Sequence, residues 1–326
     1  MGTIFRLPWA VMTQTPLTIT QLHLPDARHL ADKVQQLLAD VQQHDGVAAF
    51  SEQFIHGLTD TRLAHQHFLA QLDGRIVGVL GLAADQAELA VTPAYRRRGV
   101  AHRLVAAASY GDGNLSLWAH GNLPPAQGFV SGFSAEKTRE LLVMATKTRL
   151  PAVQPSADYQ LLTLAEARNR WGKSADQELI RVNNEAFAWH PEQGGWDEER
   201  WARAQESSWF NPDDVLLLVR MGAETTPEVM GFHWVKWLEA QVTGKAAVGE
   251  VYVVGLADRG RRKGLGSALI SAGLEVLWNH GAELVELYVE ADNKSAISAY
   301  EKLGFAVVES HAVYTAPKSE WSVNSR

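Results

Sequence analysis

The chain has 326 residues, of which 46% are hydrophobic and 21% charged, and its net charge is −7 at pH 7. This length exceeds what one hydrophobic core usually serves, so a folded protein of two domains is expected. The negative charge disfavours nucleic acid as a partner. No apolar run is long enough to cross a bilayer, so we expect no membrane association and a cytoplasmic location.

The sequence contains no cysteine. This excludes a thiolate nucleophile, a disulfide framework and cysteine-ligated zinc. The 12 histidines show none of the spacings that are typical of metal sites, so we expect no metal. The chemistry therefore has to come from other polar side chains.

Helical and strand patterns alternate along the first half of the chain. Apolar residues recur every three or four positions in the helical segments, and they form short runs or alternate in the strands. The expected elements are helices over 27–43, 51–58 and 102–108, and strands over 68–72, 75–83, 87–91, 115–119 and 141–146.

The second half repeats this order after a linker that contains Pro151 and Pro155. Its expected elements are strands over 161–164, 215–220, 229–236, 249–256, 284–290 and 306–314, and helices over 176–187, 264–280 and 294–303. The expected fold class is α/β, of the α+β type. It consists of two tandem domains, over 1–150 and 151–326, each a twisted mixed sheet flanked by helices.

A basic Gly-rich loop follows a strand and opens a helix in each half. The second reads Arg261-Arg-Lys-Gly-Leu-Gly266, and a similar loop runs from Arg96 to Ala101, 165 positions earlier. Backbone N–H groups of such a loop, and the positive end of the following helix, can bind an anion. One such loop is more often a solvated turn. Its repetition in the same context indicates a ligand that contains a diphosphate.

Further motifs follow the second loop in a fixed order. They are Asn293-x-x-Ala, then Tyr300, then Leu303-Gly-Phe305. The ordered set resembles the GNAT family of N-acetyltransferases. The resemblance covers both halves, from about residue 40 to 314, and it is stronger in the second. It implies acetyl-CoA as the co-substrate, with its pyrophosphate on the loop and its pantetheine arm along the preceding strand.

The resemblance also implies which residues contact the coenzyme. In the second half they are Val254, Gly255, Leu256, Arg261, Arg262, Lys263, Gly264, Leu265, Gly266, Ser267, Asn293, Lys294, Ser295, Ala296, Ile297 and Ser298. In the first half they are Leu89, Ala90, Val91, Arg97, Arg98, Gly99, Val100, Ala101 and His102.

A narrower likeness concerns the acceptor. The segments 190–196, 249–253 and 287–293 resemble a tandem branch of the family that acetylates the cysteinyl amine of a cysteinyl-glucosaminyl-inositol. This likeness implies a small thiol-containing amine as substrate, and we expect the protein to be a monomer. It implies substrate contacts from Glu52, Glu192, Lys236, Glu250 and Tyr288. The GNAT pattern alone leaves open another amine, such as an aminoglycoside or a peptide N-terminus, and a coenzyme sensor without turnover.

Glu250 and Tyr300 are the expected catalytic residues. An α-amine has a pKa near 7.7–8.0, so a modest base such as Glu250 is enough to take its proton. Strand alternation places Glu250, Tyr252 and Val254 on one face. A tyrosine with a pKa near 10 stays protonated and can donate to the departing thiolate. Taken alone, Tyr300 would be a core aromatic residue and Glu250 a surface charge, and the surrounding motifs favour the catalytic roles.

The first half lacks part of this set. Gly128 stands where the offset from Gly132-Phe133 would place a tyrosine, and the Asn-x-x-Ala motif is missing. Asp85 lies as far before the first loop as Glu250 lies before the second, so a carboxylate alone does not separate the halves. We predict that the first half binds coenzyme without turnover, that Glu52 helps to shape the acceptor cleft, and that the second half is catalytic.

Overall fold

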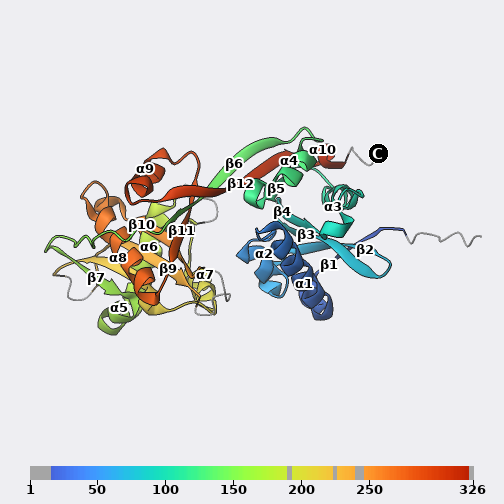
Figure 1. Cartoon of the computed structure of the whole chain (residues 1–326). Helices are drawn as coiled ribbons and strands as arrows, with labels where there is room; N and C mark the ends of the chain where they lie inside the picture. The colour runs from blue at the N-terminus through green and yellow to red at the C-terminus, as the bar shows by residue number, and fades with distance from the viewer. Residues whose placement is uncertain (1–15, 189–192, 223–225, 239–245, 323–326) are drawn as a thin grey trace, which may run out of the picture. The chain divides into compact units, whose positions relative to one another are not determined.

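The computed structural model describes residues 16–188, 193–222, 226–238 and 246–322 (Figure 1). The chain divides into two compact units. The N-terminal unit comprises residues 1–140 together with 310–326, and the C-terminal unit comprises residues 141–309. In the part of the chain that the structure describes, no helix is long and apolar enough to cross a membrane.

The N-terminal unit is a mixed sheet in the order β1-β2-β3-β4-β5-β12, in which β4 and β5 are parallel neighbours. Its strands are β1 (Thr18–Leu22), β2 (Gln66–Leu72), β3 (Arg75–Ala83), β4 (Gln86–Val91), β5 (Asn114–Ala119) and the later part of β12 (Ala306–Pro317). Its helices are α1 (Arg28–Asp45), α2 (Glu52–Gly57), α3 (Val100–Ala108), α4 (Pro124–Val130) and α10 (Lys318–Ser322).

Apolar layers on both faces hold the helices on this sheet. Val34 and Leu38 of α1 pack in one cluster with Val79 of β3. Leu104 of α3 packs in another cluster with Leu80, the next residue of β3. Successive residues of β3 therefore face different helices, as the two-residue period of a strand requires.

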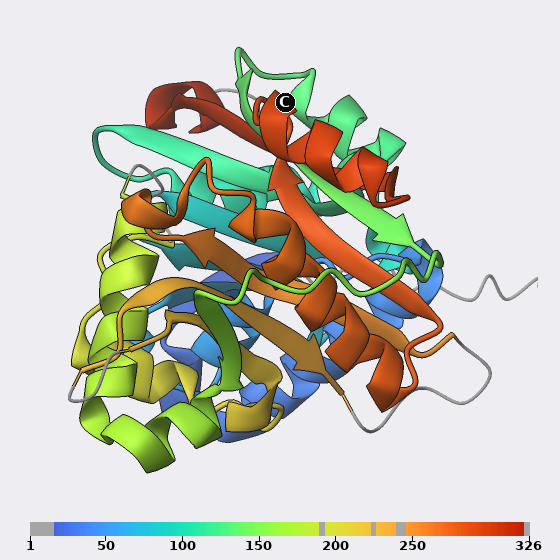
Figure 2. The ribbon, with the colours of Figure 1, turned by 90° about the vertical axis from the view of Figure 1, so that its left-hand side faces the viewer.

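The C-terminal unit repeats the plan with the strand order β6-β11-β10-β9-β8-β7, in which β10 and β11 are parallel. Its strands are the later part of β6 (Glu136–Thr146), β7 (Tyr159–Thr163), β8 (Val215–Arg220), β9 (Val229–Trp237), β10 (Val248–Leu256) and β11 (Leu284–Glu290). Its helices are α5 (Leu164–Trp171), α6 (Lys173–Ala186), α7 (Glu198–Ala204), α8 (Leu265–His280) and α9 (Lys294–Lys302). α8, orange in Figure 2, packs against β8, β9 and β10, and α5, α6 and α7 pack on the opposite face.

Each sheet is completed by a strand from the other half of the sequence. Residues 312–317 of β12 pair antiparallel with β5, and residues 141–146 of β6 pair antiparallel with β11. These strands cover edges whose N–H and C=O groups would otherwise be open to other chains. Residues 310–326 thus belong to the N-terminal unit, and the boundary expected at 150/151 does not coincide with the division of the structure.

Every expected helix and strand is present, most with ends within three residues of those expected. The sequence pattern does not predict β1, α4, α5, α7 or α10, which have five to eight residues each. Segments of one or two turns carry too few apolar positions for a period to stand out. Ser51 precedes α2, but its side chain makes no capping bond, and its N–H donates to Glu88 instead.

His233 of β9 makes the stability of the C-terminal unit depend on pH. The side chain is fully buried, and its Nδ1 lies 3.0 Å from the carbonyl oxygen of Leu269. Burial lowers the pKa of His233 to about 4. The unfolded chain binds this proton near pH 6.5, so the contribution to stability falls as the pH drops from 6.5 towards 4. We expect a loss of about 2 kcal/mol from this residue between pH 7 and pH 5.

Urea unfolding followed by tryptophan fluorescence at the two pH values measures this loss. His233→Gln keeps a donor for the carbonyl of Leu269 and does not titrate in this range. The variant should therefore lose less stability than the wild type on acidification. Equal losses in the two proteins would show that His233 is not the titrating group.

Candidate active site

An exposed basic loop joins β10 to α8 in the C-terminal unit. Arg262 has a φ of 60° and Gly264 a φ of 74°, so the backbone is left-handed at both positions. Left-handed residues within such a turn direct successive N–H groups to one side. The first N–H groups of α8 have no partner within the helix and carry its positive dipole end. The loop therefore has the geometry of an anion site.

The first loop has the same conformation. Arg97 has a φ of 59° and Gly99 a φ of 77°, and each stands 165 positions before its counterpart. A short 3-10 turn precedes each loop, at Pro93–Tyr95 and at Asp258–Gly260. The repeated loop that the sequence indicates is thus a repeated structure.

A groove of about 1300 Å³ lies beside the first loop within the N-terminal unit. This volume exceeds that of a pocket for a drug-sized ligand and suits a coenzyme. Eight of the residues that we expect to contact the coenzyme line this groove. They are Leu89, Ala90, Val91, Arg97, Gly99, Val100, Ala101 and His102. Arg98 is not among the described lining residues, and its guanidinium lies 5.3 Å from the centre of the Tyr95 ring.

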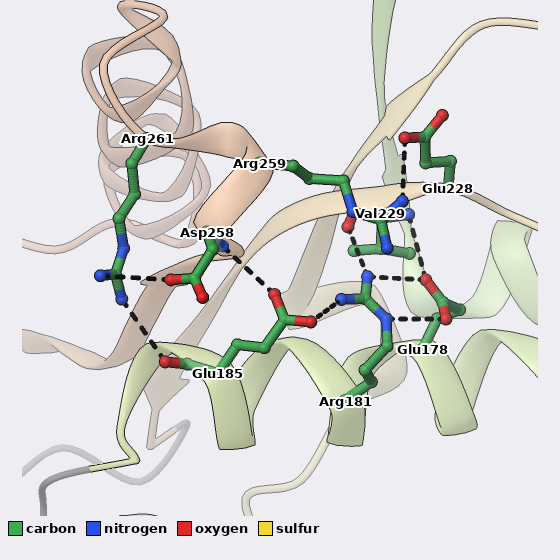
Figure 3. A network of polar contacts seen from close by, with 8 residues as sticks. All are labelled: Glu178, Arg181, Glu185, Glu228, Val229, Asp258, Arg259 and Arg261. Carbon is green, nitrogen blue, oxygen red and sulfur yellow. Dashed lines mark hydrogen bonds and ion pairs between the residues drawn. The ribbon is translucent and has the colours of Figure 1, made fainter.

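Ion pairs fix the start of the second loop to α6 (Figure 3). Glu185 accepts a hydrogen bond from the N–H of Asp258 and contacts Arg181. Arg261 pairs with Asp258 at 3.3 Å and donates to the carbonyl oxygen of Glu185. Burial opposes the ionisation of Glu185, but the hydrogen bonds from Arg181 and Asp258 outweigh it and lower the pKa of this carboxyl. Arg261 thus anchors the loop, and its contact with coenzyme stays a prediction.

Arg96 has the same structural part in the first loop. Its guanidinium makes two hydrogen bonds to Asp45, of 2.8 and 2.7 Å, and a third to the carbonyl oxygen of Val91. Asp45 is the last residue of α1, as Glu185 lies in the last turn of α6. In both units the first arginine of the loop therefore ties it to the end of a helix.

The two glycines of the second loop differ in what requires them. Gly264 has a left-handed φ that a side chain adopts only with strain. The nearest atom to a Cβ at Gly266 would be Leu256 Cδ1 at 3.6 Å, which is an ordinary contact. The protein itself does not need glycine at 266, and Ala101 holds the same place in the first loop. Gly266 leaves the backbone open to the close approach of a ligand, which is compatible with a pyrophosphate on the loop.

The parallel strands separate before the loop in both units. The pairing of β10 with β11 ends at Val251 and Leu287, while β10 continues to Leu256. The pairing of β4 with β5 covers only two residue pairs and ends at Ala87, while β4 continues to Val91. The backbone beyond these points can accompany an extended ligand, as expected for the residues from Val254 to Leu256.

A β-bulge changes the face on which the residues of β10 lie. The register with β9 shifts between Val251 and Val253, so Tyr252 is the extra residue. Tyr252 and Val253 both pack in the cluster of α5, α6 and α7, whereas Val254 packs with the residues of α8. The expectation that Glu250, Tyr252 and Val254 share one face is therefore wrong for Val254, because alternation fails at a bulge.

The residues expected to contact the acceptor meet only in part. Lys236 pairs with Glu250 across the β9–β10 ladder, and Nζ lies 4.0 Å from Oε2. Tyr288 lies on β11, 46% exposed. Glu52 begins α2 in the N-terminal unit, where its role stays a prediction. Glu192 lies outside the described residues.

Sequence reasoning missed Glu286, which is the neighbour of Glu250 in the parallel ladder. Burial, and secondarily the charge of Glu309, raise the pKa of Glu286. Parallel partners lie on the same face, so a second carboxyl group stands on the side that carries Glu250. Its position two residues before Tyr288 is the sequence signal that would have found it.

Tyr300 lies on α9 and packs with Ala296 and Leu303 against the core under α8. Asn293 caps this helix, because its side-chain oxygen accepts a hydrogen bond from the N–H of Ala296 at 3.2 Å. Burial raises the pKa of Tyr300 to about 12. The phenol therefore keeps its proton throughout the neutral range, although it is a weaker acid than a solvated tyrosine.

Strand register identifies the counterpart of Glu250 in the N-terminal unit. The offset from the loop points to Asp85, but the bulge in β10 adds one residue that β4 lacks. Gln86 is the residue that holds the place of Glu250 in the parallel ladder. Its antiparallel partner is Ala83, where Glu250 has Lys236. Asp85 is thus not the counterpart of Glu250. A carboxylate at this position of the ladder is therefore a feature that distinguishes the second half from the first.

The helix that follows β5 is present even without an Asn-x-x-Ala motif. α4 begins with proline in its first turn and has no side-chain cap. Gly128 lies on this helix, so it carries no phenol at the place of Tyr300. The first half therefore keeps the shape of the unit and lacks both expected catalytic groups.

A buried acidic residue of the N-terminal unit also escaped the sequence analysis. Glu88 is 2% exposed, accepts the N–H of Ser51 at 2.7 Å and lies 3.1 Å from Nε2 of His120. His311 of β12 accepts the N–H of Gly121. These contacts attach the turn after β5 to β4 and β12.

Comparisons with known proteins agree with this geometry. The model of the acetyltransferase (GNAT) family matches residues 179–305, and that of an acetyltransferase (GNAT) domain matches residues 64–130. A tandem GNAT protein from the clavulanic acid biosynthesis pathway has the same fold, with a TM-score of 0.67 and 20% identity over 93% of this chain and 99% of that one. A GCN5-related N-acetyltransferase from Sphaerobacter thermophilus gives a TM-score of 0.62 and 19% identity over 92% and 96%.

The chain belongs to the GNAT family and is an acetyl-CoA-dependent N-acetyltransferase with two copies of the domain. The mycothiol acetyltransferase of Corynebacterium aurimucosum is 45% identical over 299 residues, which are 89% of this chain and 96% of that protein. That of Corynebacterium glutamicum is 43% identical over 307 residues, 93% and 99% of the two chains. Within the GNAT family, the chain belongs with the mycothiol acetyltransferases.

The two loop glycines offer a paired test of the coenzyme site. Gly266→Ala should fold normally and weaken acetyl-CoA binding by roughly tenfold, equivalent to the loss of about one charge-assisted hydrogen bond. Gly264→Ala should lower the free energy of unfolding by about 1 kcal/mol, because alanine is strained at this φ. Isothermal titration calorimetry and thermal unfolding measure the two effects. Unchanged affinity in Gly266→Ala would show that the ligand does not approach this backbone.

Proposed function

We propose that the protein transfers the acetyl group of acetyl-CoA to the cysteinyl amine of cysteinyl-glucosaminyl-inositol, forming mycothiol and CoA. The observation that carries this proposal is the 45% identity with a mycothiol acetyltransferase over 89% of the chain. The substrate is thus a small thiol-containing amine. We further propose that the protein acts as a monomer in the cytoplasm.

Glu250 acts as the base or as the carboxylate that orients the amine. About a tenth of an α-amine with a pKa near 8 is neutral at pH 7, so its deprotonation costs only about 1 kcal/mol. A carboxylate on β10 beside the separated strands is sufficient for this step, directly or through water. Lys236 at 4.0 Å keeps a positive charge beside that carboxylate.

Tyr300 acts on the departing sulfur. A phenol with a pKa of about 12 is always protonated, so a donor is present in every molecule. Full transfer to a thiolate whose thiol has a pKa near 8.5 would be uphill by about 5 kcal/mol. The phenol therefore first stabilises the leaving thiolate by a hydrogen bond, and burial of the sulfur raises the thiol pKa towards that of the phenol.

Glu250 and Tyr300 work from different sides of the sheet. Glu250 precedes the bulge on the face of α6, and Tyr300 packs on the face of α8. The separation of β10 from β11 opens the sheet between those faces. We infer that the reacting atoms lie at this separation, with Tyr288 and Glu192 as further acceptor contacts and Glu52 shaping the acceptor cleft.

The coenzyme is held by the chain's backbone and loop cations. Val254 to Leu256 accompany its pantetheine arm, and Asn293 to Ser298 lie beside the same arm. Arg261 to Ser267 surround its pyrophosphate. The groove of the N-terminal unit holds a second coenzyme without turnover, since Gln86 and Gly128 stand where a base and an acid are needed.

Substitution of the two groups tests the catalytic assignment. Glu250→Gln and Tyr300→Phe should each lower kcat by roughly 10²-fold or more, because each removes one proton-transfer group. Gln86→Leu, at the counterpart position in the N-terminal unit, should leave kcat unchanged. Release of CoA thiol provides the rate. The assignment of the catalytic unit is wrong if Tyr300→Phe retains the full rate while a change at Gly99 abolishes it.

Comparison of acceptors tests the substrate. The same thiol-release assay should show a higher kcat/KM for cysteinyl-glucosaminyl-inositol than for a simple cysteine amide or an aminoglycoside. Sugar and inositol contacts add binding energy that a cysteine amide lacks. Equal values for the three amines would refute the specific acceptor. Absence of thiol release with every amine would favour a coenzyme sensor.

A further inference from the structure

The ammonium of Lys236, on β9, lies against two aromatic rings on the face that carries Glu250. Its Nζ lies 4.8 Å from the centre of the Trp209 ring and 5.6 Å from the centre of the Tyr252 ring. The carboxylate of Glu250 lies 4.0 Å from the same nitrogen. Two π faces and one negative charge therefore surround the ammonium, and all three attract a cation.

The two rings are themselves fixed by the core. Trp209 and Tyr252 meet edge to face at 4.8 Å, and both contact Trp234, at 5.2 and 4.9 Å. Trp234 is 1% exposed and Trp209 is 9% exposed. Aromatic contacts of this kind define both the distance and the tilt of the rings. The cradle formed by Trp209 and Tyr252 is therefore rigid before any substrate binds.

A rigid cradle restricts the mobility of the Lys236 side chain. An unrestrained lysine has a flexible four-carbon stem and prefers to leave a partly exposed ion pair for water. With Trp209 and Tyr252 beside it, the ammonium of Lys236 stays within reach of Glu250 and loses little freedom when an acceptor binds. The carboxylate of Glu250 then keeps one orientation, with the ammonium of Lys236 held beside it.

The N-terminal unit shows the same strands without this device. Ala83 and Gln86 occupy the paired positions that Lys236 and Glu250 hold in the C-terminal unit. The β3–β4 ladder runs without a register shift, so it has no counterpart of the extra residue Tyr252. The N-terminal unit thus folds without the aromatic cradle, the lysine or the carboxylate. This argues that the three features have a role in the reaction and are not needed for the stability of the sheet.

We propose that Trp209 and Tyr252 are positioning residues that hold the Lys236 ammonium against Glu250 and so fix the orientation and charge environment of the group that receives the acceptor's proton. The inference rests on the proposed function of Glu250. The first test concerns only the geometry and needs no substrate.

Nuclear magnetic resonance of the lysine ε-CH₂ groups supplies that test. Two ring faces should shift the Lys236 signal upfield, and Lys236→Met assigns it by its loss. The signal should move towards the position of a solvated lysine in Trp209→Leu and remain largely in place in Trp209→Phe, which keeps a π face. An unchanged signal in Trp209→Leu would overturn the cradle.

A double-mutant cycle on kcat tests whether the rings act through the lysine. Trp209→Leu should lower kcat by roughly tenfold, as expected when a catalytic group loses its geometry, and should cause no further loss in the Lys236→Met background. Independent, multiplicative losses would mean that Trp209 merely supports the core and would overturn the proposal. Tyr252→Leu provides a second cycle if circular dichroism shows that Trp209→Leu does not fold.

Trp201 is the matched control, because it packs on Trp234 in the same cluster. The described contacts of the Lys236 ammonium with aromatic rings involve Trp209 and Tyr252, and not Trp201. Trp201→Leu should therefore leave the Lys236 signal in place and combine independently with Lys236→Met.

A full rate in Glu250→Gln would refute the proposed base, and with it the catalytic purpose of the cradle. The nuclear magnetic resonance experiment would still decide separately whether Trp209 and Tyr252 hold the ammonium of Lys236.

Discussion

The early end of one parallel ladder is the constraint on which the active site depends. β10 pairs with β11 only as far as Val251, and beyond that residue the strand keeps its β9 neighbour and runs on to the basic loop. A fully paired strand has no backbone groups left for an extended ligand. Beyond the separation, β10 continues to the loop that opens α8. We propose that groups on opposite faces of the sheet act together at this separation. The loop glycines and the helix dipole complete a site that this separation begins.

Duplication supplies an internal comparison of scaffold and catalyst. The two loops share their left-handed residues, their anchoring arginines and the preceding turns. They differ at the position of the proposed base: Glu250 faces Lys236 in one unit, and Gln86 faces Ala83 in the other. We propose that the shared features bind and orient the coenzyme, which explains why both copies have them. We propose that the features found in one copy alone are the ones that acetyl transfer requires.

The bulge at Tyr252 shows how one extra residue changes a site. It places Tyr252 and Val253 on the same face, turns Val254 towards α8, and brings an aromatic ring against the ammonium of Lys236. It also moves the counterpart of Glu250 from Asp85 to Gln86. Sequence offsets count residues, whereas strand register counts paired positions. The two counts diverge by one wherever a bulge intervenes.

Local pattern in the sequence determined the longer helices and strands, the duplication, the basic loops and the family. Helical and strand periods are set by neighbouring residues, and the motifs around Gly264 and Asn293 are contiguous, so no distant contact is needed to recognise them. Tertiary structure alone decided the rest. The exchange of β6 and β12 depends on hydrogen bonds between strands far apart in the chain, and no local signal marks it. The face of Val254, the neutral counterpart at Gln86 and the cradle around Lys236 depend on register and on side-chain packing across strands, which a linear pattern does not encode.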